Sequence, residues 1–343
     1  MAAPAQFLLS SVRDDEPLPP INIKRDRNKT LHDPSDSAQQ VALPKIISQR
    51  SPQYYTLEAD KFLQDSEVVR RLDGIQLARP DPSILSHRNE SDVTRSLEHS
   101  VNREIAILLV EGLSAKGSFA MESTSQASNT IVIPNPGPSE PQAITYIPDW
   151  MARCEAQLSD GRMRSSRLIL EYKDRGLSCV EDFLAEFERT QSRLEKLYEE
   201  MKREAERMER EMRAGQASNG FTDLNTPERS RNAASSRSTL GLRHPSPFND
   251  NVTRILHQVT TYAVAEGGTY VGLPDYDSLV MFEYPAVKHM MDSGVGEVDR
   301  LRKGPGNYVH VTTVTDPGQI RRVLTGAWIK GIRGDRIPHF FRA

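Results

Sequence analysis

The spacing of apolar positions predicts several helices and strands between residues 90 and 284. Apolar residues recur every three or four positions over 90–112 and again over 251–265, which is the period of one helix face. Short runs of β-prone residues over 143–150, 167–174 and 268–284 predict strands, the last run as two strands joined by an acidic turn. Helices interleaved with strands in this way predict an α/β domain with a mixed central sheet flanked by helices.

Two weaker patterns lie before and after the 90–112 helix. Residues 54–77 have an amphipathic helical pattern, and residues 118–133 are expected to supply the first strand, with Ile131 to Ile133 as its clearest part. The strand should follow the 90–112 helix directly. We therefore expect the domain to begin with helices and to enter its sheet near residue 120.

A long helix is predicted over 178–213. Apolar residues repeat at alternating intervals of four and three over 180–212, broken only by Gln191, which is the heptad pattern of a coiled-coil seam. The first half, with Phe183 and Leu194, is apolar enough to dock on the domain, whereas the Met- and Ala-rich second half suits an exposed arm. The seam is also suited to pairing with a second copy, which would give a homodimer.

The rest of the chain is too polar to be ordered throughout. Only 37% of the 343 residues are hydrophobic, and the mean hydropathy is −0.56. Residues 1–50 and 214–249 are rich in Pro, Ser, Asn and charged residues, so both are expected to be disordered. The predicted organisation is a disordered tail over 1–50 and one domain over 51–343, interrupted by the 178–213 helix and the 214–249 linker.

Composition excludes several classes of protein. The two cysteines are too few for a disulfide framework, and no apolar run is long enough for a membrane span or a signal peptide, so we expect an intracellular protein, nuclear or cytoplasmic. The histidines form no metal-binding spacing, and no glycine-rich phosphate loop is present. The net charge of −3 does not indicate a nucleic-acid binder. After residue 285, however, the chain has ten Lys or Arg and only five Asp or Glu. These basic residues either bind phosphates or are ordinary surface charges.

Two carboxylates and a lysine are the candidate chemistry. Asp149 follows one predicted strand, and Glu171 and Lys173 end the next. Alternate residues of a strand share a face, so Glu171 and Lys173 point the same way, and neighbouring strands would bring Asp149 beside them. Paired carboxylates suit Mg²⁺, and a lysine can orient the attacking water or offset developing charge. The alternative is two unrelated strand ends that carry surface charges.

A second pair of polar residues follows on the 251–265 helix. Gln258 and Tyr262 lie four residues apart, so they share one face at the border of its apolar stripe. Taken alone, they could be a solvated glutamine and a half-buried tyrosine.

In this order, the motifs resemble those of the PD-(D/E)XK nuclease superfamily. The matching residues are Pro148-Asp149, Glu171-Tyr172-Lys173, and the Gln258-x-x-x-Tyr262 element of the RecB-type branch. The helix, strand, acidic turn and strand over 251–284 look like nuclease-like domains of many fungal proteins. The resemblance covers roughly residues 90–284, with interruptions, and implies a restriction-endonuclease-like core.

The resemblance also implies an activity and a role for each residue. The protein would hydrolyse phosphodiester bonds in DNA or RNA with Mg²⁺ or Mn²⁺. Asp149, Glu171 and the carbonyl of Tyr172 would hold the metal, Lys173 would assist the water, and Gln258 with Tyr262 would complete the site.

Members of the superfamily often place a further glutamate near the metal, on a helix before the first strand. Glu98 and Glu104 both border the apolar stripe of the 90–112 helix, and the spacing of Glu104 from Val101 and Leu108 favours Glu104 as the further metal ligand. The rival interpretation is a catalytically inactive module of the same fold. Such a module would bind nucleic acid or a protein partner, through the inserted helix for example.

Overall fold

The computed structural model describes residues 5–14, 18, 41–78, 90–114, 119–125, 128–133, 142–157, 163–173, 180–192, 203 and 248–333. The chain divides into two compact units, Met1–Phe187 with Phe248–Ala343, and Glu188–Pro247. All elements named below belong to the first unit. Most of the second unit, including the second half of the predicted heptad helix and nearly all of the predicted 214–249 linker, lies outside the described residues.

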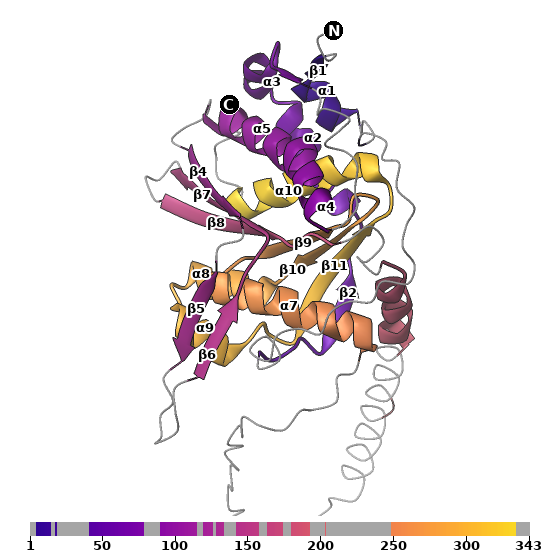
Figure 1. The fold of residues 1–343 in the computed structure, drawn as a ribbon, viewed down its shortest axis with the longest axis vertical. Coiled ribbons are helices and arrows are strands. Elements are labelled where there is room, and N and C mark those ends of the chain that lie inside the picture. The colour runs from indigo at the N-terminus through magenta and orange to yellow at the C-terminus, as the bar shows by residue number, and fades with distance from the viewer. Residues whose placement is uncertain are drawn as a thin grey trace, which may run out of the picture. The chain divides into compact units, whose positions relative to one another are not determined.

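A mixed sheet forms the centre of the first unit (Figure 1). Its seven described strands lie in the order β2 (Ile46–Gln49), β11 (Tyr308–Val314), β10 (Leu279–Glu283), β9 (Tyr270–Pro274), β8 (Met163–Leu170), β7 (Trp150–Gln157) and β4 (Phe119–Ser125). The pairs β2–β11 and β8–β9 are parallel, and the other neighbours are antiparallel. The predicted α/β class and mixed central sheet are therefore confirmed.

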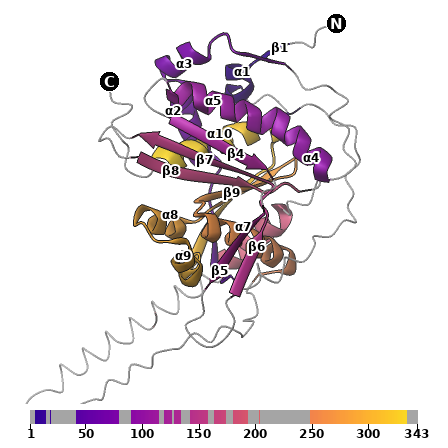
Figure 2. The same cartoon turned by 60° about the vertical axis from the view of Figure 1, so that its left-hand side comes forward.

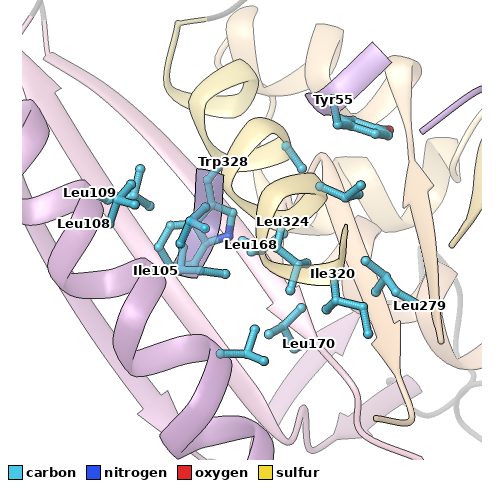
Figure 3. Close-up of a cluster of buried hydrophobic side chains, with 14 of the residues drawn as sticks. Tyr55, Ile105, Leu108, Leu109, Leu168, Leu170, Leu279, Ile320, Leu324 and Trp328 are labelled. Carbon is cyan, nitrogen blue, oxygen red and sulfur yellow. The ribbon is translucent and has the colours of Figure 1, made fainter. Parts of the chain in front are cut away.

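Helices cover one face of this sheet with a large apolar core. They are α1 (Leu8–Arg13), α2 (Gln53–Leu63), α3 (Ser66–Leu72), α4 (Glu90–Leu97), α5 (Arg103–Ser114) and α10 (Ile320–Arg333), the last preceded by the short 3-10 helix η4 (Pro317–Gln319). Figure 3 shows Leu168 and Leu170 of β8 among side chains of α5 and α10. Trp150 and Trp328 stack in the same core with ring centroids 5.5 Å apart.

The opposite face of the sheet packs on α7 (Asp250–Glu266), α8 (Pro285–Asp292) and α9 (Glu297–Lys303). Ile169 points into this second core, whereas its neighbours Leu168 and Leu170 point into the first, as expected of a strand buried on both faces. Consecutive residues at the end of β8 therefore alternate between two different environments. This alternation decides where the candidate site residues lie.

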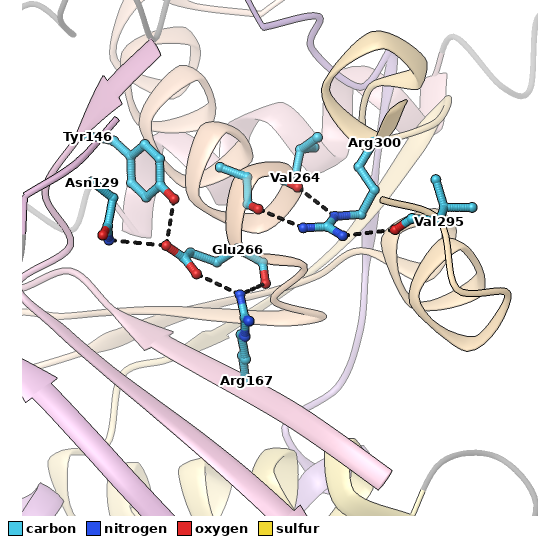
Figure 4. A network of polar contacts seen from close by, with 8 residues as sticks. Asn129, Tyr146, Arg167, Val264, Glu266, Val295 and Arg300 are labelled. Atoms are coloured by element: carbon cyan, nitrogen blue, oxygen red, sulfur yellow. Dashed lines mark hydrogen bonds and ion pairs between the residues drawn. The ribbon is translucent and has the colours of Figure 1, made fainter. Parts of the chain in front are cut away.

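The ends of α7 are fixed by local chemistry. Asn249 caps its N-terminus by accepting from Val252 N, and Gly267 ends it in the left-handed conformation that glycine adopts without strain. Arg300 donates to the carbonyls of Val264 and Ala265 (Figure 4). The predicted 251–265 helix is confirmed, and the Asn249 cap fixes its start at Asp250.

The last residue of α7 also ties the helix to neighbouring strands. The Glu266 carboxylate lies 2.6 Å from Arg167 Nη1 and accepts from Tyr146 Oη at 2.5 Å and from Asn129 Nδ2 at 3.1 Å (Figure 4). Asn129 and Tyr146 belong to a separate antiparallel ribbon of β5 (Asn129–Ile133) and β6 (Gln142–Tyr146). A second small ribbon pairs β1 (Ala5–Phe7) with β3 (Gln76–Ala78).

One predicted strand, over 118–133, is divided in the structure. Its first part forms β4 in the central sheet, and its second part forms β5 in the ribbon. Phe119 and Met121 of β4 pack on the core of α10, whereas Ile131 of β5 is buried in the core of α7. The two halves separate because their apolar side chains are buried in different cores.

The N-terminal 50 residues are not wholly a tail. Leu8 and Val12 of α1 are fully buried, and Ile47 of β2 is buried at the edge of the central sheet. Leu8 N donates to Ile75 O at 3.1 Å, and β2 pairs in parallel with β11. The prediction of disorder over 1–50 is thus corrected for these segments. Their apolar runs are too short to show a period among the many polar residues around them.

The start of the inserted helix belongs to the first unit and packs on its core. Residues 180–187 are helical, and Val180, Phe183 and Phe187 are buried in the core of α7. The ring of Phe183 meets that of Phe282 edge-on, with centroids 5.4 Å apart. Docking of the first part is confirmed, and the proposed homodimer through 180–212 stays a prediction. No helix among the described residues is long and apolar enough to cross a membrane.

Candidate functional site

Asp149 lies at the start of a strand, not at the end of one as predicted. β6 ends at Tyr146, the proline at position 148 has no N–H to continue a ladder, and β7 begins at Trp150. Because β7 runs antiparallel to β8, its first residue pairs with Leu170, the last residue of β8. Asp149 Oδ2 accepts a hydrogen bond from Tyr172 N at 2.8 Å. The expected convergence of the Asp149 and Glu171 segments is confirmed.

Glu171 and Lys173 continue the line of β8 beside β9. Glu171 N donates to Gly272 O at 3.0 Å, and Lys173 N donates to Pro274 O at 3.1 Å, so the backbone stays extended past the end of β8. Lys173 Nζ lies 2.9 Å from Glu171 Oε1, and both side chains are largely buried. The two side chains share a face, as predicted.

Gln258 and Tyr262 reach this pair from α7, which packs against β8 and β9 (Figure 2). Gln258 Nε2 donates to Glu171 Oε1 and lies 3.0 Å from Tyr262 Oη. Tyr262 Oη donates in turn to Ile147 O at 3.3 Å. Burial, and next the Glu171 carboxylate, raise the pKa of Tyr262, so its hydroxyl stays protonated as a donor. Four of the side chains predicted at one site, those of Glu171, Lys173, Gln258 and Tyr262, therefore form one connected polar group.

The second oxygen of Glu171 has no partner. Glu171 Oε2 is buried without a hydrogen bond, while Oε1 is shared by Lys173 and Gln258. A buried carboxylate oxygen without a donor is costly, so native structures normally supply a donor, a water or an ion. Together with Asp149 and the Tyr172 carbonyl, this oxygen offers the hard donors that Mg²⁺ and Mn²⁺ take from proteins.

The site has fewer acidic groups than a closed metal cage. Among the described residues, no three His, Cys, Asp or Glu side chains gather as a cluster that could hold a metal ion. Mg²⁺ keeps most of its water and is commonly held by one or two carboxylates plus substrate oxygens. The residues present therefore fit an open Mg²⁺ or Mn²⁺ site, and they do not fit a structural zinc site.

The side chain of Tyr172 points to the opposite face of the sheet from Glu171. It is fully buried in the core of α5 and α10, where Asn102 Nδ2 donates to its hydroxyl. Burial is the main cause of its raised pKa; the Asn102 hydrogen bond opposes this shift, and the carboxylates of Glu98 and Asp149 add to it. Sequence reasoning missed Asn102, because a lone asparagine within a helical pattern carries no distinguishing signal.

Glu104 does not join the site, which corrects the sequence prediction. Its side chain is only 4% exposed, and its Oε2 lies 2.9 Å from Arg321 Nε and 3.1 Å from Ser11 Oγ. These partners belong to the helical layer on the Tyr172 face, away from Glu171. Glu98, the other glutamate considered, accepts from Ser125 Oγ at 3.1 Å and contributes to the raised pKa of Tyr172.

Part of the C-terminal positive charge is used inside the protein. Arg321 is buried against Glu104, and Arg300 caps α7. Arg322 pairs with Asp60 at 2.6 Å. These arginines do not form a surface for phosphates, so the C-terminal excess of basic residues is weaker support for nucleic-acid binding than its count indicates.

Comparison with known proteins returned no relative. A scan against protein-family models matched no family, and searches of curated proteins and of solved structures gave no match. The function must therefore be inferred from the geometry of the site itself.

Proposed function

We propose that this chain is a metal-dependent nuclease of the PD-(D/E)XK type, built on a restriction-endonuclease-like core. The observation that carries the proposal is the convergence of Asp149, Glu171 and Lys173, with a buried oxygen of Glu171 left without a partner. The order of these groups along the chain matches the superfamily motif, and their spatial arrangement supplies the chemistry that the motif needs. The substrate would be DNA or RNA, and the cofactor Mg²⁺ or Mn²⁺.

Each residue has a role that follows from its contacts. Asp149 Oδ, Glu171 Oε2 and the Tyr172 carbonyl would hold the ion, which lowers the pKa of a bound water and offsets charge on phosphate oxygens. Gln258 holds Glu171 by its other oxygen, Oε1, and so leaves Oε2 for the ion. Tyr262 orients Gln258 and is itself tied to the Ile147 carbonyl before Asp149.

Lys173 is the side chain suited to act on the attacking water and the phosphate. Its ammonium lies 2.9 Å from Glu171 Oε1 and is largely buried, where a positive charge acts more strongly than in water. It can hold the attacking water and stabilise the negative charge that develops as the new P–O bond forms and the leaving P–O bond breaks. Loss of such a group typically costs about 100-fold or more in rate.

A cleavage assay tests the proposal. Labelled single-stranded DNA, double-stranded DNA and RNA are incubated with Mg²⁺, with Mn²⁺ and with EDTA, using the wild type, Lys173→Ala and Asp149→Asn. Lys61→Ala and Asp299→Asn, which change side chains that are mostly exposed, are the matched controls. We expect cleavage that needs the metal, is lost by about 100-fold or more in the two site variants, and is unchanged in the controls.

The rival function is a catalytically inactive module that binds nucleic acid or a protein partner. Two observations favour it. Lys173 already neutralises Glu171 within the protein. Three C-terminal arginines also bond to groups of the protein itself. Binding of nucleic acid that persists in EDTA, without cleavage of any substrate in either metal, would establish the module and reject the nuclease.

A further inference from the structure

A π-helical turn interrupts the long helical segment that packs beside the candidate site. η3 (Glu98–Asn102) lies between α4 and α5, and Arg103 N donates to Glu98 O, five residues back. Single π turns inside α-helices are rare and are found frequently at functional sites. None of the roles assigned above explains why this helix has one.

Buried charges stabilise the turn. Arg321 Nε donates to Ser100 O at 2.9 Å, a carbonyl within the turn, and also lies 2.9 Å from Glu104 Oε2. The Arg321 side chain is only 1% exposed. The wider turn alters the ordinary pattern of backbone acceptors, and Arg321 provides a donor for one of them while Glu104 balances its charge.

The π turn places the Asn102 side chain against Tyr172. Asn102 is buried, and it donates to the hydroxyl of a tyrosine that is itself fully buried. The same tyrosine is held at its backbone, because Asp149 accepts from Tyr172 N at 2.8 Å. The residue between Glu171 and Lys173 is therefore anchored twice, at its backbone N–H and at its side-chain hydroxyl.

We infer that Asn102 is a positioning residue for the metal site and acts through Tyr172. The Asn102 bond fixes the hydroxyl end of Tyr172, while Asp149 holds Tyr172 N and Pro274 O holds Lys173 N, so the Tyr172 carbonyl between these bonds is fixed relative to Asp149 and Glu171. Partners that orient metal ligands in this way typically contribute 10- to 100-fold to metal affinity or activity. The inference rests on the proposed function, since it concerns the ion that Asp149 and Glu171 would hold.

Titration with Mn²⁺ alone tests this role, followed by circular dichroism melting of each variant and by cleavage kinetics. The variants are Asn102→Leu, Tyr172→Phe and the double change. Asn251→Leu is the matched control, because the side chain of Asn251 also donates to a side-chain oxygen, that of Asp182, at 2.9 Å but at the first turn of α7. We expect Mn²⁺ affinity to fall about 10- to 100-fold in both single variants and to stay unchanged in the control.

The double variant separates positioning from stability. Replacing both buried partners by apolar groups removes the unsatisfied hydroxyl or amide, so melting should return toward the wild-type temperature. Mn²⁺ affinity should stay low, because the anchor is still absent. If Mn²⁺ affinity recovers together with stability, or never falls, Asn102 has only a structural role and the inference is overturned. Absence of Mn²⁺ binding by the wild type would overturn the proposed metal site together with the inference, whereas the other outcomes leave that site intact.

Discussion

Changing Glu104 to leucine while Arg321 remains would remove the carboxylate that pairs with a buried guanidinium. The pair joins α5 to α10, and its side chains are 4% and 1% exposed. Breaking such a pair by removing one partner typically costs about 3–5 kcal/mol, because the remaining charge is neither solvated nor neutralised. Total stabilities are about 5–15 kcal/mol, so this single change should consume a large part of the stability of the first unit.

The double variant Glu104→Leu/Arg321→Met should recover most of that loss. Apolar replacement of both members of a buried pair is often neutral or stabilising. Here Ser100 O would still lose its hydrogen bond from Arg321, and a hydrogen bond to a charged group typically contributes about 1.5–3 kcal/mol. We therefore expect the double variant to be less stable than the wild type by about 1.5–3 kcal/mol, and more stable than Glu104→Leu.

Urea unfolding followed by far-ultraviolet circular dichroism and by fluorescence of the two tryptophans measures these differences. The matched control is Asp60→Leu. Asp60 on α2 pairs with Arg322, the neighbour of Arg321 on α10, but both side chains are 23% exposed, so breaking this pair should cost less than breaking the buried one. A loss for Glu104→Leu no larger than that of the control, or a double variant as unstable as the single one, would refute this account of the pair.

Three further predictions concern other buried groups. Burial, and next Arg50, lower the pKa of His310 from 6.5 to about 4, so as the pH falls the unfolded chain takes up this proton before the folded chain does. The contribution of His310 to stability is therefore complete above pH 6.5 and is lost as the pH falls toward 4. NMR titration of the wild type and acid unfolding of His310→Gln check this prediction. In Gly326→Ala the new Cβ would lie 1.9 Å from Tyr55 O, so we expect destabilisation by about 1–3 kcal/mol or more in thermal melts, while Gly296→Ala, whose Cβ meets nothing within 4 Å, should be nearly neutral. Burial raises the pKa of Cys154 to about 12, so mass spectrometry should find its thiol unmodified by a maleimide at pH 8 until the protein unfolds.

Strong periodicity accounts for the elements that could be predicted from the sequence. The 251–265 pattern and the two strands over 268–284 correspond to α7, β9 and β10; both strands are wholly buried, and α7 buries its apolar face. By contrast, β2 has only four residues and owes its existence to pairing with β11, more than 250 positions along the chain. No local pattern can reveal such a strand, because the partner that stabilises it is remote in sequence.

The candidate site shows the same division between local and remote information. Glu171, Lys173, Gln258 and Tyr262 could be placed together because a two-residue strand period and a four-residue helix spacing each define a face. Glu104 was assigned by assuming a regular helix from residue 90 to residue 112. The π turn at Glu98–Asn102 breaks that regularity and changes which residues after it face the site. Arg321, the actual partner of Glu104, lies more than 200 residues away in sequence.

Metal binding by the Arg321→Met variant shows whether Glu104 is a metal ligand or supports the π turn through Arg321. If Glu104 were a metal ligand, removing it would weaken Mn²⁺ binding far more than removing Arg321, which carries a positive charge and cannot bind a cation. The observed contacts imply the opposite ranking of the two variants, because Arg321 bonds the turn directly at Ser100 O, whereas Glu104 supports the turn through its ion pair with Arg321. Arg321→Met should therefore weaken Mn²⁺ binding at least as much as Glu104→Leu does, measured at a temperature where circular dichroism shows both variants folded. A much larger loss of affinity in Glu104→Leu would return that carboxylate to the metal site and contradict the positioning role of the turn.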